Sequence, residues 1–384
     1  MSLIPMPGAL SDDECLLVEA ALAFAREELL PLDRAWDVDE SSVAQVLPKL
    51  SDMGLLSLLI PQTYGGLECS YRTYAAILHE IARWSPSTCV TIGVHNMVGM
   101  ILSRRASEAV KQQVLPSWGT EENFSAFAVS EAGAGSDVGS TKTSAVEADG
   151  GFRVTGEKMW VTNGLAGRWF FTLVRIQGDP PKGDLSAMLI DGRLPGIERT
   201  RITGKMGIRG SETAVIHFNE AFVPEDHLVG PRGGGMEVCL AGLNSGRIGI
   251  AAQATGIAEA CLDEMVSYAR QREQFGRPIG SFQAVADMIA QSAVELEAAK
   301  VLVWRAASAV DAGTPSPGAS AMAKLYASEC ANRIAYRAVQ VHGGAGYVRE
   351  CRVEQLYRDA RITSIYEGTS EIQRIVVARE LANS

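Results

Sequence analysis

The spacing of apolar side chains divides the chain into three regions. Up to about residue 120, apolar residues recur every three or four positions, which is the period of an amphipathic helix. In residues 11–30, Leu17, Ala21 and Phe24 follow this period and predict a helix that ends at Pro31. Further helices are expected around residues 41–53, 70–83, 87–102 and 107–115.

The helical period disappears between about residues 124 and 231. Short apolar runs, such as residues 168–176 and 185–190, are separated by Gly, Pro and Asp clusters. Residues 213–218 alternate small or polar side chains with apolar ones, as a strand with one buried face does. This region is therefore predicted to be an antiparallel β-domain.

After three consecutive glycines at 233–235 the chain becomes helical again and rich in Ala, over about 236–270, 281–312 and 317–343. Small residues on many faces of long helices suit close packing in a bundle. The predicted fold class is α+β and multidomain. It comprises an N-terminal helical domain (1–123), a middle antiparallel β-domain (124–231) and a C-terminal four-helix bundle (232–384).

Composition excludes some classes of function. The net charge of −10 argues against nucleic acid as a partner, although a small anion can still bind where charge is locally positive. The seven cysteines are scattered, without C-x-x-C or a nearby His, so no metal site is expected. No apolar run is long enough to cross a membrane, and residues 1–5 lack the features of a secretory signal. We expect a cytoplasmic protein that binds no membrane.

Several common catalytic motifs are missing from the sequence. It contains no G-x-S-x-G, no H-E-x-x-H, no G-x-x-x-x-G-K-[ST] and no G-x-G-x-x-G. A Rossmann dinucleotide site is therefore not expected.

Two segments of the middle region can contact a ligand. Residues 129–137 (VSEAGAGSD) contain a run of small residues, which let backbone N–H groups approach a ligand. A plain turn is the alternative. In residues 159–164 (MWVTNG), Trp160 and Thr162 end a predicted strand before an Asn-Gly turn. The indole can stack on a flat ring whose polar edge Thr162 contacts, or it can belong to the core.

A third segment, residues 365–373 (IYEGTSEIQ), contains a carboxylate just before a predicted helix. Ser370 and Gln373 have capping-box spacing, so a helix is expected to begin at Ser370. Glu367 then lies on a loop made flexible by Gly368. A catalytic carboxylate and a structural one near the N–H groups of a helix start are both consistent with this position.

These three segments, with residues 268–279 (YARQREQFGRPI) and 340–347 (QVHGGAGY), resemble the acyl-CoA dehydrogenase family in the same order over nearly the whole chain. The resemblance implies FAD between the β-domain and the bundle. It implies cofactor contacts from Val129, Ser130, Ser136, Trp160, Thr162, Arg272, Phe275, Gln283, Thr369 and Glu371. It also implies that Gln340, Gly343 and Gly344 reach the FAD of a neighbouring subunit, in a homo-oligomer that is usually a tetramer.

The same resemblance implies the reaction. Glu367 is expected to remove the α-proton of an acyl-CoA while the β-hydrogen leaves as hydride to the flavin, and an electron-transferring flavoprotein is expected to take the electrons. The implied substrate contacts are Ser136, Ser211, Asn244, Arg247 and Gly368, and Arg247 can equally be a structural ion-pair residue. Three alternatives remain open. The substrate can be a thioester bound to a carrier protein, the enzyme can be a flavin oxidase or monooxygenase, or the chain can be a helical interaction protein without cofactor.

Two positions depart from patterns seen in relatives. Many relatives carry Asp where this chain has Asn244, which removes a charge near the thioester. Relatives that act on glutaryl thioesters carry Arg where this chain has Cys89, so a substrate with a distal carboxylate is not expected. Gly93, Met97 and Met100 are candidates for shaping the acyl pocket, although Met at helical spacing is also typical of core.

Overall fold

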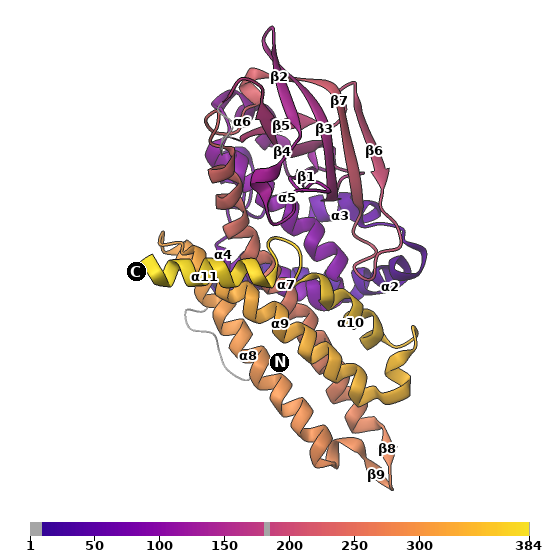
Figure 1. Ribbon diagram of the computed structural model, residues 1–384. Helices are drawn as coiled ribbons and strands as arrows, with labels where there is room; N and C mark the ends of the chain where they lie inside the picture. Colours follow the sequence, from indigo (N-terminus) through magenta and orange to yellow (C-terminus); the bar gives the residue numbers. More distant parts are fainter. Residues whose placement is uncertain (1–9, 180–184, 384) are drawn as a thin grey trace.

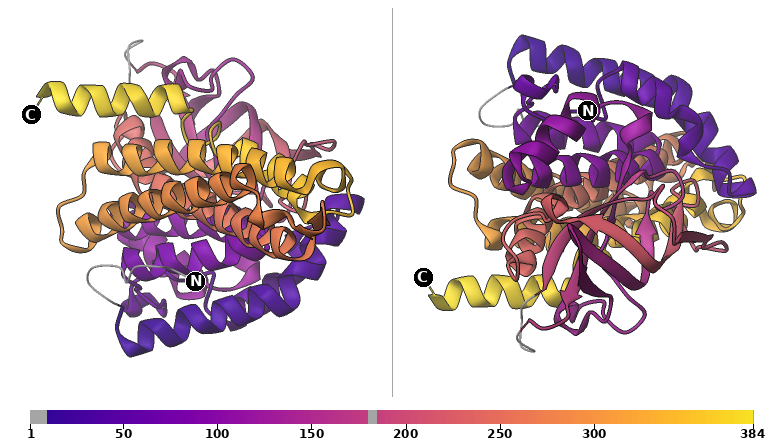
Figure 2. Two further views of the ribbon diagram at one scale, coloured as in Figure 1. Left: turned by 90° about the horizontal axis from the view of Figure 1, so that it is seen from below. Right: turned by 90° about the horizontal axis from the view of Figure 1, so that it is seen from above.

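The computed structural model describes residues 10–179 and 185–383, so residues 1–5, where the sequence shows no secretory signal, lie outside the described residues. Three regions follow one another along the chain, as predicted (Figure 1). The β-sheet lies at one end of the molecule and the long helices of the C-terminal region extend to the other. Figure 2 shows the N-terminal helices along one side of the C-terminal bundle.

The N-terminal region is helical because local capping signals and apolar periodicity agree. Its helices are α1 (Asp12–Phe24), α2 (Leu30–Asp39), α3 (Leu47–Asp52), α4 (Tyr71–Trp84), α5 (Pro86–Arg105) and α6 (Glu108–Val114). Ser11 and Glu14 form a capping box at the start of α1. The Ser85 side chain caps α5, and Pro86 occupies its first turn, where no intrahelical N–H is needed.

The prediction that the first helix ends at Pro31 is wrong. A π-helical turn at Ala25–Leu29 separates α1 from α2, and α2 continues to Asp39. Pro31 thereby falls in the first turn of α2, the part of a helix where proline is best tolerated.

The middle region forms a seven-stranded sheet in the order β1-β4-β2-β3-β7-β6, with β5 also paired to β4. The strands are β1 (Ser125–Ala128), β2 (Ser144–Ala148), β3 (Gly151–Thr162), β4 (Trp169–Ile176), β5 (Ser186–Asp191), β6 (Ile197–Arg201) and β7 (Thr213–Pro224). The antiparallel prediction holds for most pairs, but β4 pairs in parallel with β1 and β2. The long connections between these strands let the chain return and run in the same direction.

The C-terminal helical bundle is confirmed. It contains α7 (Gly235–Gln271), α8 (Gln283–Asp311), α9 (Pro317–His342), α10 (Arg352–Ile362) and α11 (Ser370–Asn383). The helix α7 packs against α8 and α9, and also against α4 and α5 of the N-terminal region. Its far end carries the short pair β8 (Glu273–Gln274) and β9 (Arg277–Pro278) (Figure 1).

The hydrophobic core does not follow the region boundaries. One cluster joins Trp36 and Tyr74 of the N-terminal helices to Ile248, Ile334 and Leu356 of the bundle. Buried alanines on α7 and α9 let these helices approach closely. No helix among the described residues combines the length and apolar character that a membrane crossing needs.

Candidate active site

Glu367 lies in a left-handed turn between α10 and α11. Its φ is 50° and that of Gly368 is 90°, so two consecutive residues leave the right-handed region. A glutamate rarely adopts this conformation, and such backbone is retained only where the surroundings hold it. The turn directs the Glu367 carboxylate towards Gly246 of α7, where a methyl group built on Gly246 would lie 2.2 Å from Oε2.

Side chains from three helices hold this turn. Lys324 Nζ of α9 donates to the Gly368 carbonyl at 2.7 Å, and Gln373 Nε2 of α11 donates to the same carbonyl at 2.8 Å. The Tyr366 hydroxyl donates to Gln253 Oε1 of α7, and Gln253 Nε2 donates to the Pro86 carbonyl at 2.9 Å. The position of Glu367 is therefore fixed by contacts between distant segments.

The helix after the turn begins at Ser370, as predicted, but the capping-box interpretation is wrong. Thr369 is the cap, because its hydroxyl accepts the Ile372 N–H at 3.4 Å and its carbonyl accepts the Gln373 N–H at 3.0 Å. The Gln373 side chain instead donates to the carbonyls of Glu367 and Gly368. Ser370 lies one position too late to accept from the first-turn N–H groups.

The Glu367 carboxylate has an unusual electrostatic environment. Its Oε2 is buried and accepts no hydrogen bond from the described residues. Burial raises the pKa of Glu367 to about 7, although the Lys324 and Arg247 cations oppose the rise. A carboxylate with a pKa near 7 is a stronger base than an ordinary glutamate and is still ionised in part at neutral pH. Burial therefore dominates over any effect of the helix start.

A small, mostly apolar cavity of about 210 Å³ lies beside Glu367. Helices α4, α5 and α7 supply its walls: Tyr74, Leu78, Cys89, Val90, Gly93, Gly246, Gly249, Ile250 and Gln253. Of the residues suggested for an acyl pocket, Gly93 lines it and Met97 lies against Gly246. Met100 does not line it and packs in a separate core cluster with the start of α7.

Three of the predicted substrate residues lie in two places near this cavity. Asn244 and Arg247 are one turn apart on α7, and Arg247 Nη1 donates to Asn244 Oδ1 at 2.6 Å. Arg247 is buried and its Nε has no partner among the described residues. The buried Ser211, whose Oγ likewise lacks a partner, belongs to a loop whose Ile208 packs in one cluster with Tyr366.

The predicted flavin residues of the β-domain form an open surface. The Trp160 side chain is 60% exposed, so it does not belong to the core. Its backbone has a φ of 61°, at an irregularity of the β3–β7 pairing that turns the indole outward. Residues 131–134 form a tight turn. The backbone of this loop is open to a ligand, because methyl groups built on Gly133 and Gly135 would meet nothing within 4 Å. Ser136 is exposed, whereas Val129 is buried and Ser130 and Thr162 are partly so. An exposed indole beside open backbone fits an isoalloxazine ring.

A buried ion pair supports this surface. Lys158 Nζ donates to Glu131 Oε1 at 2.8 Å and to the Val129 carbonyl at 3.2 Å. The Glu131 carboxylate also accepts from Thr143 Oγ1 at 2.6 Å. These bonds hold the 129–137 loop against β3.

Six of the remaining predicted FAD residues lie far from Trp160 within one chain. Arg272, Phe275 and Gln283 are exposed near the β8–β9 pair, which lies at the opposite end of the molecule from the sheet (Figure 1). Gln340, Gly343 and Gly344 are exposed at the end of α9. Tyr268 stacks on His342 with ring centroids 4.2 Å apart, so both sets lie at the same end of the bundle. Thr369 and Glu371 lie beside Glu367, where Thr369 caps α11.

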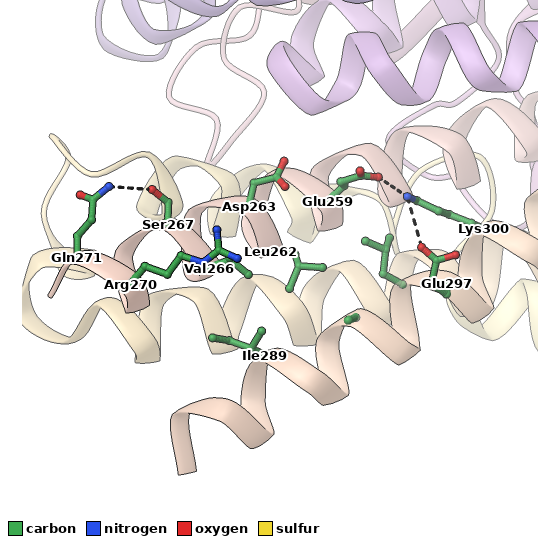
Figure 3. A pocket seen from close by; sticks show the side chains of 12 residues that line it. Glu259, Leu262, Asp263, Val266, Ser267, Arg270, Gln271, Ile289, Glu297 and Lys300 are labelled. Carbon is green, nitrogen blue, oxygen red and sulfur yellow. Dashed lines mark hydrogen bonds and ion pairs between the residues drawn. The ribbon is translucent and has the colours of Figure 1, made fainter. Parts of the chain in front are cut away.

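A second groove lies between α7 and α8 and contains none of the predicted site residues (Figure 3). Its walls are apolar around Leu262 and Ile289. At one end Lys300 forms ion pairs with the buried Glu259 and with Glu297. This groove lacks the orphaned carboxylate that distinguishes the cavity at Glu367.

Sequence reasoning missed Lys324, Gln253, Gly246 and Tyr74. A signal existed for Lys324, which is a lone charge in the Ala-rich stretch 319–327 predicted to face other helices. The other three are unremarkable in sequence, and only the convergence of α4, α7 and the 365–369 turn gives them a place at the site.

Comparisons with known proteins agree with this geometry. Family models described as the N-terminal, middle and C-terminal domains of acyl-CoA dehydrogenase match residues 11–122, 126–221 and 233–382. The short-chain specific acyl-CoA dehydrogenase of Rattus norvegicus mitochondria is 38% identical, over 96% of this chain and 90% of that protein. The structure of butyryl-CoA dehydrogenase from Megasphaera elsdenii superposes with a TM-score of 0.95 at 31% identity, over 98% of this chain and 100% of that chain.

The prolyl acyl carrier protein oxidase AnaB superposes with a TM-score of 0.92 at 28% identity, over 97% of this chain and 100% of that chain. Similar structures also include FAD complexes. The chain therefore belongs to the acyl-CoA dehydrogenase family and is an FAD-dependent oxidoreductase.

Proposed function

We propose that this protein converts a short acyl-CoA to its trans-2-enoyl-CoA, with Glu367 as the base that removes the α-proton. The observation that carries the proposal is Oε2 of Glu367, which is buried beside a small apolar cavity and has no hydrogen-bond partner among the described residues. A buried carboxylate oxygen without a hydrogen bond is costly to keep, and catalytic bases are a common reason for retaining one.

The reaction needs a base, a polarised carbonyl and a hydride acceptor. The proton passes from Cα to a Glu367 carboxylate oxygen, and the C–H electron pair forms the new Cα–Cβ double bond as the β-hydrogen leaves with its own pair. We propose that the Glu367 backbone N–H donates to the thioester carbonyl and stabilises the developing enolate. FAD, when bound, supplies the acceptor for the hydride. The rigid turn at Glu367 keeps the base within reach of Cα.

The walls of the cavity support a short acyl chain. Tyr74, Leu78 and Cys89 line it and leave little room beyond a few carbons. Two relatives named for short-chain acyl-CoA and for butyryl-CoA point the same way. Because Cys89 is uncharged, a substrate with a distal carboxylate is disfavoured.

The separation of the two FAD-binding sets supports a homo-oligomer, which we propose is a tetramer. Trp160 lies on the sheet, whereas Phe275, 93% exposed, lies at the far end of the bundle (Figure 1). A second subunit can bring residues such as Gly343 to the FAD bound at the first. The electron acceptor we propose is an electron-transferring flavoprotein.

The experiment is anaerobic mixing of the FAD-loaded protein with acyl-CoAs from butyryl to palmitoyl, including branched and cyclic members. Loss of the flavin colour with butyryl-CoA, and slower loss as the chain lengthens, is the expected result. No bleaching by any acyl-CoA would refute the proposal.

A carrier-protein substrate is the second candidate, favoured by the similarity to a prolyl acyl carrier protein oxidase. It predicts bleaching by an acylated carrier protein and little by the CoA ester. An oxidase, unlike a dehydrogenase, would be reoxidised rapidly by oxygen.

A further inference from the structure

Lys324 is a buried charge that packing alone does not explain. Its side chain is fully buried in α9, among buried alanines such as Ala321, Ala323 and Ala327. Removing an ammonium group from water is unfavourable unless it is bonded and paired. An apolar side chain would fill the same space, so the retained charge requires a role.

The ammonium group contacts the turn that carries the base. Lys324 Nζ donates to the Gly368 carbonyl at 2.7 Å, across 44 positions of sequence. Gln373 Nε2 donates to the same oxygen at 2.8 Å, so the carbonyl is held from α9 and from α11. Glu367 and Gly368 both have positive φ, and a turn of this kind relaxes unless its carbonyls are fixed.

We propose that Lys324 is a positioning residue: by binding the Gly368 carbonyl it holds the turn that places Glu367 in the cavity, and its charge stabilises the ionised carboxylate. The inference rests on the proposed function of Glu367 as the base. It extends that function to a residue on α9 that does not line the cavity.

The charges around the two groups set the expected pH dependence. Glu367 faces Lys324 on α9 and Arg247 on α7, and both cations lower its pKa against the effect of burial. Lys324 faces Glu367, Arg247 and the Glu371 carboxylate of α11. Burial lowers the pKa of Lys324 to about 8, so its side chain is mostly charged at pH 7. The hydroxyls of Tyr74 and Tyr366 also face Glu367, but burial raises their pKa well above 10 and they stay neutral.

Removing the Lys324 charge leaves Arg247 as the remaining cation that faces Glu367 among the described residues, so the pKa of Glu367 rises further. The base must be ionised to act. The acid limb of the pH profile for kcat/KM therefore moves to higher pH when Lys324 is replaced by a neutral side chain.

The test compares Lys324→Met with Lys324→Arg and with a control, Lys300→Met. Lys300 is also nearly buried, but it pairs with Glu259 and Glu297 in the groove between α7 and α8 (Figure 3). Amide hydrogen exchange over residues 363–373 reports the turn in FAD-loaded protein without any turnover. The pH profile of flavin reduction by butyryl-CoA reports the base.

We expect Lys324→Met to accelerate exchange in this segment about tenfold or more. We also expect it to move the acid limb up by about one pH unit and to lower kcat more than it changes KM. Lys324→Arg should keep the acid limb near that of the wild type, and it provides the charge test if the Met variant does not fold. Lys300→Met should change neither property.

Unchanged exchange over residues 363–373 in Lys324→Met overturns the positioning role whatever the activity. An unchanged acid limb overturns the role of the charge. Failure of the wild type to be bleached by any thioester instead refutes the proposed function, and the exchange result then decides this inference by itself.

Discussion

Gly246→Ala tests whether Glu367 must occupy its observed place. A methyl group at this position would lie 2.2 Å from Glu367 Oε2, 3.0 Å from its Cδ and 2.6 Å from Met97 Sδ. Ordinary van der Waals contact begins at 3.4 Å, so the carboxylate has to retreat by about 1 Å. A catalytic group displaced by about 1 Å loses roughly 100-fold in rate. Alanine is favoured over glycine in a helix by about 1 kcal/mol, so α7 itself should not be weakened.

The assay is anaerobic stopped-flow reduction of the bound flavin by butyryl-CoA, with FAD content and thermal unfolding measured on the same samples. Gly249→Ala, one turn along α7, is the comparison. Its methyl group would lie 3.2 Å from Leu78 Cδ1 and Tyr74 Oη, which can shift slightly, so it should narrow the cavity without moving the base. A Gly246→Ala protein that contains FAD and reduces it at the wild-type rate would show that the observed carboxylate position is not the reactive one.

Three further outcomes follow from the same contacts. Because burial raises the pKa of Glu367 to about 7, the ionised fraction of the base shrinks as the pH falls below that value. The value of kcat/KM should therefore fall tenfold per pH unit well below 7, and an acid limb near the ordinary glutamate pKa would contradict this. Leu78→Ala enlarges the cavity and should raise kcat/KM for hexanoyl-CoA relative to butyryl-CoA by roughly tenfold or more, and an unchanged ratio would place the acyl chain elsewhere. Lys158→Met leaves the Glu131 carboxylate without its cation. It should lower the free energy of unfolding, measured by urea titration, by about 3–5 kcal/mol and weaken FAD retention. Wild-type stability of this variant would mean that the ion pair is dispensable.

Much of the fold could be predicted because local signals agree along most of the chain. The helical pattern and the high Ala content predicted α7, α8 and α9 within a few residues of their observed ends. The helix end predicted at Pro31 was wrong because the π-helical turn before it changes the hydrogen-bond register. The spacing of apolar residues does not reveal such a turn. The parallel pairs of β4 were missed because pairing direction depends on which strands become neighbours.

Site residues that belong to a sequence motif could be predicted. Site residues that only tertiary contacts bring together could not. Glu367 stood out in a loop before a helix, and the resemblance to relatives gave it a role. Sequence left open whether Trp160 is exposed, because a break in the β3–β7 pairing decides it. Lys324 and Gly246 come from helices far from residue 367 in sequence, so only the packed bundle shows that they meet the base.

The central claim is that Glu367 takes the α-proton. Its most direct test is anaerobic mixing of butyryl-CoA with FAD-loaded wild type and with Glu367→Gln, which keeps the shape of the side chain but cannot accept the proton. We expect the wild-type flavin to bleach, and the variant to keep both its bound flavin and its colour. Bleaching of Glu367→Gln at the wild-type rate would contradict the account.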